Sequence, residues 1–202
     1  MSAISPSIAL ILLAAGSSSR YGSPKQLLRI DKETLVRRAA REALICDLRV
    51  VVVTGASAAP VSMEVADMPL ACVHNADWEQ GMGGSIACGM RELLRGTMTP
   101  DAAIVSLVDQ PLIGHAQFQQ LIDAHRATPQ AIVAADHGST LGPPCLFPAA
   151  YFAELARLSG AQGARRVIEA HRPAVITLNM PEAAVDIDTP ADYATALFKL
   201  GH

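Results

Sequence analysis

Residues 8–28 read IALILLAAGSSSRYGSPKQLL, and this stretch decides the fold. Its first six residues are all apolar, as expected for a strand that is buried on both faces of a sheet. A loop dominated by small residues, among them Gly16, Ser17 and Ser18, follows directly. Because the ligand crevice of an open α/β sheet lies beyond the C-terminal ends of its strands, this loop is the first candidate for a binding site.

The rest of the chain repeats this alternation between short apolar runs and longer segments of helical character. We predict that the first strand spans residues 8–13 and that others span residues 50–53, 70–73, 102–108, 131–134 and 174–178. Helices are predicted at residues 34–45, 84–94, 116–127, 149–158, 163–171 and 190–200. Thr189 is the expected cap of the last helix, because Pro190 suits a first helical turn. The pattern predicts an α/β fold with a mostly parallel sheet that is covered by helices.

Length and composition are consistent with one domain. The 202 residues are 50% apolar and 17% charged, which is enough for one sizeable core. No repeat, low-complexity tract or long linker divides the chain, so we expect a single domain over residues 1–202. Residues 136–148 hold three prolines and have no regular pattern, and we predict a loop-rich insertion there.

Charge and hydropathy argue against two classes of partner. Lysine and arginine (16) are slightly outnumbered by aspartate and glutamate (19), and like charges do not cluster, so we expect no nucleic-acid partner. The longest apolar stretch, residues 8–15, is far shorter than the roughly 18 to 20 residues that cross a bilayer. No basic residue precedes it, so we expect no membrane partner and a cytoplasmic location. The four cysteines match neither zinc nor disulfide spacing and are expected to be small buried residues.

The loop after the first strand has the chemistry of a polyphosphate site. Small side chains let backbone N–H groups approach an anion, and Arg20 and Lys25 can add full positive charges. The loop is neither GxxxxGK[ST] nor GxGxxG, so the two commonest phosphate loops are absent. On these features alone, a flexible surface turn with a solvated Arg20 and Lys25 remains an alternative.

The complete string, Leu-Ala-Ala-Gly-x-Ser-x-Arg-x-Gly followed by Lys-Gln-Leu-Leu, resembles the signature of the MobA-like nucleotidyltransferases. Within them it is most similar to the molybdenum cofactor cytidylyltransferases. The resemblance implies a Rossmann-like three-layer α/β/α fold of the nucleotide-diphospho-sugar transferase type and a Mg²⁺ cofactor. It further implies that CMP is transferred from CTP to molybdopterin, which yields the cytosine dinucleotide and pyrophosphate. A molybdoenzyme or its chaperone would then be a further partner.

The same resemblance implies which residues bind the nucleotide. In the first segment these are Leu13, Ala14, Ala15, Gly16, Ser17, Ser18, Arg20 and Lys25. The guanylyl-transferring branch has glycine where this chain has Ala15, which favours the cytidylyl branch. A second segment matches Asn-x-x-Trp-x-x-Gly-Met-x-x-Ser, and in it Gly84 and Ser85 are candidates for base recognition. Two alternatives remain open: Ser85 could merely cap a helix, and Trp78 is expected simply to pack in the core.

Two acidic segments are candidates for a metal site. Asp109 follows a buried strand, where a carboxylate points into the crevice, and Mg²⁺ is usually held by one or two carboxylates plus substrate phosphates. Residues 186–192, Asp-Ile-Asp-Thr-Pro-Ala-Asp, again resemble the family. We prefer Asp188 over Asp186 as the second metal ligand, whereas Asp192 is expected in the first turn of a helix. Lys25, Arg20 and Asp109 are the predicted catalytic residues.

The chain departs from the family at two places that would face the acceptor. It has Gly142-Pro143-Pro144 where many relatives have Gly-His-Pro or Gly-Asn-Pro, and Ala161 where relatives often have aspartate. Both departures concern the acceptor rather than the nucleotide. Two alternatives follow: a nucleotidyltransferase that uses another NTP or a sugar or polyol phosphate, and a non-catalytic protein that binds and delivers the cofactor.

Overall fold

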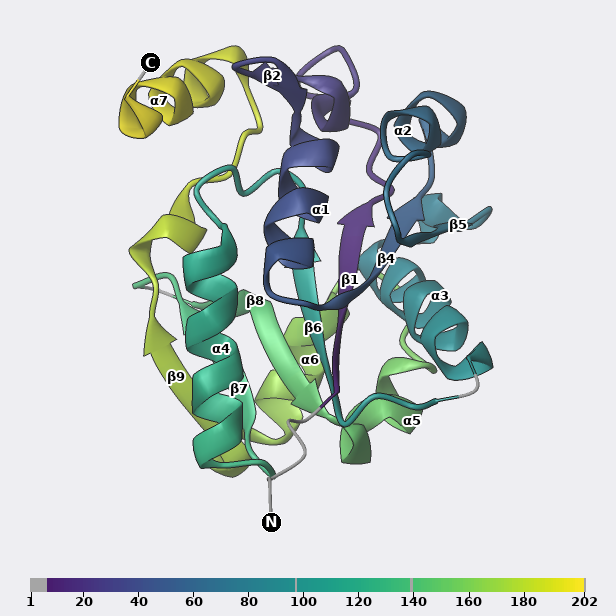
Figure 1. The fold of residues 1–202 in the computed structure, drawn as a ribbon, viewed down its shortest axis with the longest axis vertical. Helices are drawn as coiled ribbons and strands as arrows, with labels where there is room; N and C mark the ends of the chain where they lie inside the picture. Colours follow the sequence, from purple (N-terminus) through teal and green to yellow (C-terminus); the bar gives the residue numbers. More distant parts are fainter. Residues whose placement is uncertain (1–6, 97, 139, 202) are drawn as a thin grey trace.

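A seven-stranded sheet forms the centre of the protein (Figure 1). The computed structural model describes residues 7–96, 98–138 and 140–201. The strands lie in the order β5-β4-β1-β6-β8-β7-β9. All neighbouring pairs are parallel except the two that involve β8. Their bounds are β1 Ile8–Ala14, β4 Arg49–Thr54, β5 Ala71–His74, β6 Ala102–Leu107, β7 Ile132–Asp136, β8 Leu141–Pro148 and β9 Val175–Asn179.

Helices cover both faces of this sheet, so the predicted α/β architecture with three layers is confirmed. The helices are α1 Leu35–Ile45, α2 Ala58–Glu64, α3 Met82–Arg95, α4 His115–Ala127, α5 Phe152–Leu155, α6 Gly163–Ala170 and α7 Pro190–Leu200. In Figure 1, α1 and α4 lie in front of the sheet and α6 lies behind it. A small antiparallel pair, β2 Arg29–Ile30 and β3 Glu33–Thr34, precedes α1.

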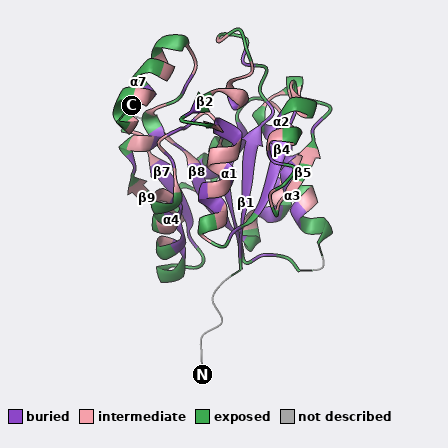
Figure 2. Ribbon diagram, turned by 45° about the horizontal axis from the view of Figure 1, so that its top comes forward, coloured by how far each residue is buried: buried purple, intermediate pink, exposed green. Residues whose placement is uncertain are grey.

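Alternate side chains of β1 pack into two separate hydrophobic cores, one on each face of the sheet. Leu10 and Leu12 belong to the core under α1 and α4, whereas Ile11 and Leu13 belong to the core under α3, α5 and α6. Successive side chains of a strand point to opposite faces, so an all-apolar strand is what a sheet covered on both faces requires. Figure 2 shows the central strands as the most buried part of the molecule.

The prediction of a loop-rich insertion at residues 136–148 is wrong. Residues 141–148 form β8, which inserts antiparallel between β6 and β7. Between β7 and β8 the register passes from Ala134↔Cys145 to Ala135↔Gly142, so Pro143 and Pro144 fall outside the ladder. Because proline has no N–H to donate, a bulge is where a strand tolerates it, and these prolines concealed the strand in the sequence.

Other differences are smaller. The predicted helix at residues 149–158 is a 3-10 turn, Ala149–Tyr151, followed by the short α5, and α2 was not predicted. Thr189 caps α7 as expected, because its hydroxyl accepts from the N–H of Asp192. The cysteines are not all buried: Cys145 is, but Cys72 is exposed and Cys46 and Cys88 are half-buried. No helix in the described part of the chain is long and apolar enough to cross a bilayer.

Candidate active site

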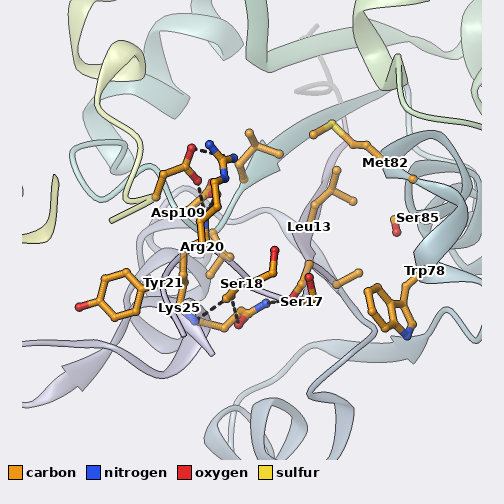
Figure 3. A pocket seen from close by; sticks show the side chains of 18 of the residues that line it. Leu13, Ser17, Ser18, Arg20, Tyr21, Lys25, Trp78, Met82, Ser85 and Asp109 are labelled. Atoms are coloured by element: carbon orange, nitrogen blue, oxygen red, sulfur yellow. Dashed lines mark hydrogen bonds and ion pairs between the residues drawn. The ribbon is translucent and has the colours of Figure 1, made fainter. Parts of the chain in front are cut away.

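A cavity of about 390 Å³ opens beyond the C-terminal ends of β1 and β6. Four stretches that are distant in the sequence line it: the loop after β1, the start of α3, the segment that carries Asp109 and the segment that carries Asp188. In the view of Figure 3, Arg20, Lys25 and Asp109 gather at one end, and Trp78, Met82 and Ser85 gather at the other. The cavity therefore has a charged end and an end lined by aromatic, thioether and hydroxyl side chains.

The charged end is built around the ammonium group of Lys25. Its Nζ lies 2.8 Å from Oδ2 of Asp109 and 2.8 Å from Oδ1 of Asp188. Burial would lower the pKa of Lys25, but the two carboxylates outweigh it and raise that pKa above its usual value. Nη2 of Arg20 lies 2.9 Å from the other oxygen of Asp188. Four charged groups of alternating sign thus meet at one end of the cavity.

Backbone contacts bring the two acidic segments together. Asp109 is the second residue after β6, so its carboxylate lies at the C-terminal end of that strand. The N–H of Ile187 donates to the backbone carbonyl of Asp109 at 2.9 Å, which fixes the approach of the C-terminal segment. The N–H of Asp188 in turn donates to Oδ2 of Asp192 in the first turn of α7. The position of Asp188 therefore depends on the cap of that helix.

The carboxylates of Asp109 and Asp188 suit a hard divalent cation. Two carboxylates from different segments already converge on one cationic group, Nζ of Lys25. No group of three or more histidine, cysteine, aspartate or glutamate side chains in the described ranges could hold a metal ion. A cation at this place would thus take Asp109 and Asp188 together with oxygens from outside the chain, and Mg²⁺ commonly binds in that way through substrate phosphates.

Asp186 has a different environment from Asp188. It is absent from the lining of the cavity, where Asp188 takes part. Burial raises the pKa of Asp186 to about 6, and the nearby Asp109 carboxylate adds to that rise, whereas a hydrogen bond with Gln110 opposes it. Of the two acids that the sequence offered, the structure brings Asp188 to Lys25.

Most of the predicted nucleotide-binding residues line the cavity. They are Leu13, Ala15, Gly16, Ser17, Ser18, Arg20, Lys25 and Ser85. Ala14 is buried in β1 and Gly84 lies within α3, and neither is part of the lining. Ser85 is buried, and its hydroxyl accepts a hydrogen bond from Nδ2 of Asn75 at 3.0 Å. The loop itself turns at Ser18, whose carbonyl accepts from the N–H groups of Tyr21 and Gly22.

Trp78 packs against the backbone at Gly55, as expected, but it also lines the cavity. A Cβ on Gly55 would lie 2.7 Å from Cβ of Trp78, so a glycine at residue 55 leaves room for the indole group. Sequence reasoning also missed the roles of Glu79, Gly81 and Met82 as lining residues. The Asn-x-x-Trp-x-x-Gly-Met-x-x-Ser pattern contained Trp78, Gly81 and Met82 and was the available signal.

The start of α3 is held against the loop at residues 159–163. The N–H of Gly83 donates to the carbonyl of Gly160 at 2.8 Å, and a Cβ on Gly83 would lie 2.7 Å from the carbonyl oxygen of Ser159. Gly81 has a φ of +113°, which favours glycine, and a Cβ there would also meet Gly160. Ala161 therefore lies in a loop that supports one wall of the cavity.

A cavity of this kind can bind a polyphosphate group. Positive side chains and small residues form one end, and two carboxylates can hold a divalent cation against an otherwise repulsive anion. The other end offers the indole of Trp78, the thioether of Met82 and the hydroxyl of Ser85 to a planar group. The arrangement has the features needed to bind a nucleoside triphosphate with its metal ion.

Comparisons with known proteins agree with this chemistry. Residues 10–175 match the profile of the MobA-like NTP transferase domain. The chain is 28% identical over 201 residues to the purine catabolism protein PucB of Bacillus subtilis, covering 94% of this chain and 95% of that protein. The crystal structure of Rv0371c from Mycobacterium tuberculosis superposes with a TM-score of 0.79 at 26% identity, over 96% of this chain and all of that one. A complex of Rv0371c with manganese has a TM-score of 0.75 at 27% identity, covering 95% and 98% of the two chains.

Proposed function

The chain belongs to the MobA-like NTP transferase family, and from this premise we propose that it transfers CMP from CTP to molybdopterin. The products are the cytosine dinucleotide of the cofactor and pyrophosphate. The observation that carries the proposal is the convergence of Asp109 and Asp188 on Lys25, beside a loop of small residues. That set of groups suits a metal-bound triphosphate better than it suits any neutral ligand.

In the proposed reaction, a terminal phosphate oxygen of the acceptor attacks the α-phosphorus of CTP in line. The new P–O bond forms as the bond from the α-phosphorus to the bridging oxygen of the β-phosphate breaks, and pyrophosphate leaves. The attacking group is already an anion, so no side chain has to remove a proton from it. The task of the protein is to position the two reactants and to neutralise their charge.

The residues of the charged end divide that task. Asp109 and Asp188 would hold the divalent cation, Mg²⁺ in this proposal, which supplies charge neutralisation at the phosphates. Lys25 and Arg20 bind the triphosphate and stabilise the charge that develops on the leaving pyrophosphate. The ammonium group of Lys25 is charged at neutral pH, because the two carboxylates outweigh the effect of burial on its pKa.

The aromatic end of the cavity is the proposed site of the base. Trp78 and Met82 would contact the face of the ring, while Ser85, fixed by Asn75, presents its hydroxyl. Ala15 adds a methyl group to the loop at the position where the guanylyl-transferring relatives have glycine. This supports the smaller pyrimidine, and hence CTP, as the nucleotide.

Ala161 favours a second candidate function. Relatives often carry an aspartate there, and in this chain the loop supports the start of α3 without a carboxylate at residue 161. A protein that binds the nucleotide or the cofactor and delivers it without turnover would tolerate this loss. Such a protein would bind CTP and release no pyrophosphate.

One experiment separates these functions. The protein is incubated with Mg²⁺, molybdopterin and each of the four NTPs, and both the dinucleotide and pyrophosphate are measured. Sugar and polyol phosphates replace molybdopterin in parallel reactions. We expect product with CTP and molybdopterin. Product with another NTP or acceptor would identify a nucleotidyltransferase of different specificity. Binding without pyrophosphate release would support the delivery function.

A further inference from the structure

The side chain of Gln26, at the base of the cavity, forms hydrogen bonds with the loop after β1. Gln26, in the 3-10 turn Lys25–Leu27, is only 2% exposed. Its Nε2 donates to the backbone carbonyl of Ala14 at 3.0 Å and to that of Gly16 at 2.7 Å. Both hydrogens of the amide are thus used to hold two carbonyl groups of the same loop. A buried amide with this pattern acts on backbone direction more than on packing.

The direction of those carbonyls determines the direction of two N–H groups. In a planar trans peptide the carbonyl and the following N–H point to opposite sides. The only cis peptide in the described residues joins Pro143 and Pro144, so the Ala14–Ala15 and Gly16–Ser17 peptides are trans. Because the carbonyls of Ala14 and Gly16 point at Gln26, the N–H groups of Ala15 and Ser17 point away from it. Both residues line the cavity.

Ser18 completes the arrangement from the other side of the loop. It has a φ of +56°, which a residue with a side chain seldom adopts. Its hydroxyl donates to Oε1 of Gln26 at 3.4 Å and accepts from the N–H of Lys25 at 2.9 Å. The turn that carries Lys25 is therefore bonded to the loop at two successive residues. Loop shape and the place of the Lys25 backbone are fixed by one network.

We propose that Gln26 is the positioning residue of the phosphate loop, acting with Ser18 to aim the N–H groups of Ala15 and Ser17 at the triphosphate. Gln26 does not touch the nucleotide in this proposal; it works by preventing the Ala14 and Gly16 peptides from rotating. If those peptides were free to flip, carbonyl oxygens would face the phosphates and repel them. The inference rests on the proposed function only in that the loop binds a nucleoside triphosphate.

The consequence is a selective loss of phosphate affinity. Oriented N–H groups recognise the outer phosphates, which a triphosphate has and a monophosphate lacks. Gln26→Met keeps the length of the side chain and removes both donors. Since a hydrogen bond to a charged group strengthens binding considerably, we expect CTP affinity to fall by about tenfold or more and CMP affinity by less than about threefold. The ratio of the two dissociation constants is the informative quantity, because general destabilisation weakens both ligands.

The test measures that ratio by calorimetry for the full chain with Mg²⁺ and no acceptor. Thr34→Val is the matched control, because Thr34 is a buried residue whose hydroxyl donates to Glu64 at 3.1 Å outside the cavity. Its ratio should equal that of the wild type. An unchanged ratio in Gln26→Met, or an equal change in Thr34→Val, would overturn the proposal.

Two further variants keep the result decisive. Gln26→Glu has nearly the same shape as the wild type but places a carboxylate oxygen opposite the two carbonyls. It should therefore weaken CTP binding relative to CMP binding at least as much as Gln26→Met does. If neither Gln26 variant folds, Ser18→Ala removes the second anchor without entering the core, and an unchanged ratio there would reject the proposal. If the wild type prefers another NTP, that nucleotide and its own monophosphate are used. The proposed CTP specificity would then fail while this inference is still tested.

Discussion

The carboxylates of Asp109 and Asp188 converge on one point: each has an oxygen 2.8 Å from Nζ of Lys25. The two acids are distant in the sequence: Asp109 follows β6, and Asp188 lies between β9 and α7. Their convergence brings two charged segments into contact with the loop after β1.

Loss of the Asp109 carboxylate should stop turnover without unfolding the protein. Asp109→Ala removes one of the two carboxylates that would hold the metal, and we expect pyrophosphate release to fall by a factor on the order of 100 or more. Asp123→Ala, on the exposed face of α4, is the control and should keep wild-type activity. Full activity in a correctly folded Asp109→Ala variant would remove the proposed mechanism.

Lys25→Ala should have opposite effects on turnover and on metal binding. Turnover should be abolished, because the triphosphate loses a partly buried positive charge. The affinity for Mn²⁺ without nucleotide should increase, because the ammonium no longer competes for the same two carboxylates. Electron paramagnetic resonance of Mn²⁺ titrations measures the second effect. Weaker Mn²⁺ binding in Lys25→Ala than in the wild type would contradict the assignment of Asp109 and Asp188.

The buried His125 should make stability depend on pH. Its Nδ1 has no hydrogen-bond partner among the residues that the structure describes, and burial lowers its pKa while the Asp101 carboxylate only partly opposes the shift. In the unfolded chain the pKa of histidine is about 6.5, so below that pH the unfolded state binds a proton that the folded state resists. The free energy of unfolding should therefore fall as pH decreases from about 6.5 toward the lower folded pKa.

His125→Leu isolates this contribution. The variant should lose less stability than the wild type between pH 7 and about pH 5 in urea titrations, since it has no proton to bind there. His115→Gln is a useful comparison, because His115 lies at the start of the same helix with its ring 59% exposed. Identical pH slopes for the wild type and His125→Leu would show that His125 does not contribute.

Two neighbouring glycines of α3 should respond oppositely to alanine. A Cβ on Gly83 would lie 2.7 Å from the carbonyl of Ser159, whereas the nearest atom to a Cβ on Gly84 is 3.7 Å away. Alanine favours helix over glycine by about 1 kcal/mol, so Gly84→Ala should raise the free energy of unfolding. Gly83→Ala should lower it despite the same helical gain. Equal shifts in thermal denaturation would mean that α3 does not lie against residues 159–163 as closely as described.

The parts of the site that could be predicted from sequence are those formed by short, continuous sequence motifs. The apolar β1, the loop after it and the acid after β6 each form a short pattern, so their meeting at the edge of the sheet follows from the topology of an α/β fold. Asp188 was preferred over Asp186 from its place before Pro190, and the structure brings Asp188 to Lys25. The roles of these residues in catalysis stay predictions.

The parts that could not be predicted depend on tertiary contacts. The strand β8 is concealed by Pro143 and Pro144, which interrupt its pattern but lie outside the ladder. Trp78 was expected only to pack, as a lone aromatic usually does, and its place in the cavity wall depends on its tertiary contact with Gly55. Gln26 is part of the Lys-Gln-Leu-Leu motif, but the motif does not predict that its amide donates hydrogen bonds to two carbonyls of the preceding loop.

The central claim is nucleotidyl transfer at the cavity, and isotope-labelled CTP tests it most directly. The protein is incubated with Mg²⁺, molybdopterin and CTP labelled either at the α-phosphate or at the γ-phosphate. We predict that the α-label appears in the cofactor dinucleotide and the γ-label in pyrophosphate, in equal amounts, and that Asp109→Ala forms neither product. Release of the γ-label as inorganic phosphate, or binding of CTP with neither label transferred, would contradict the account.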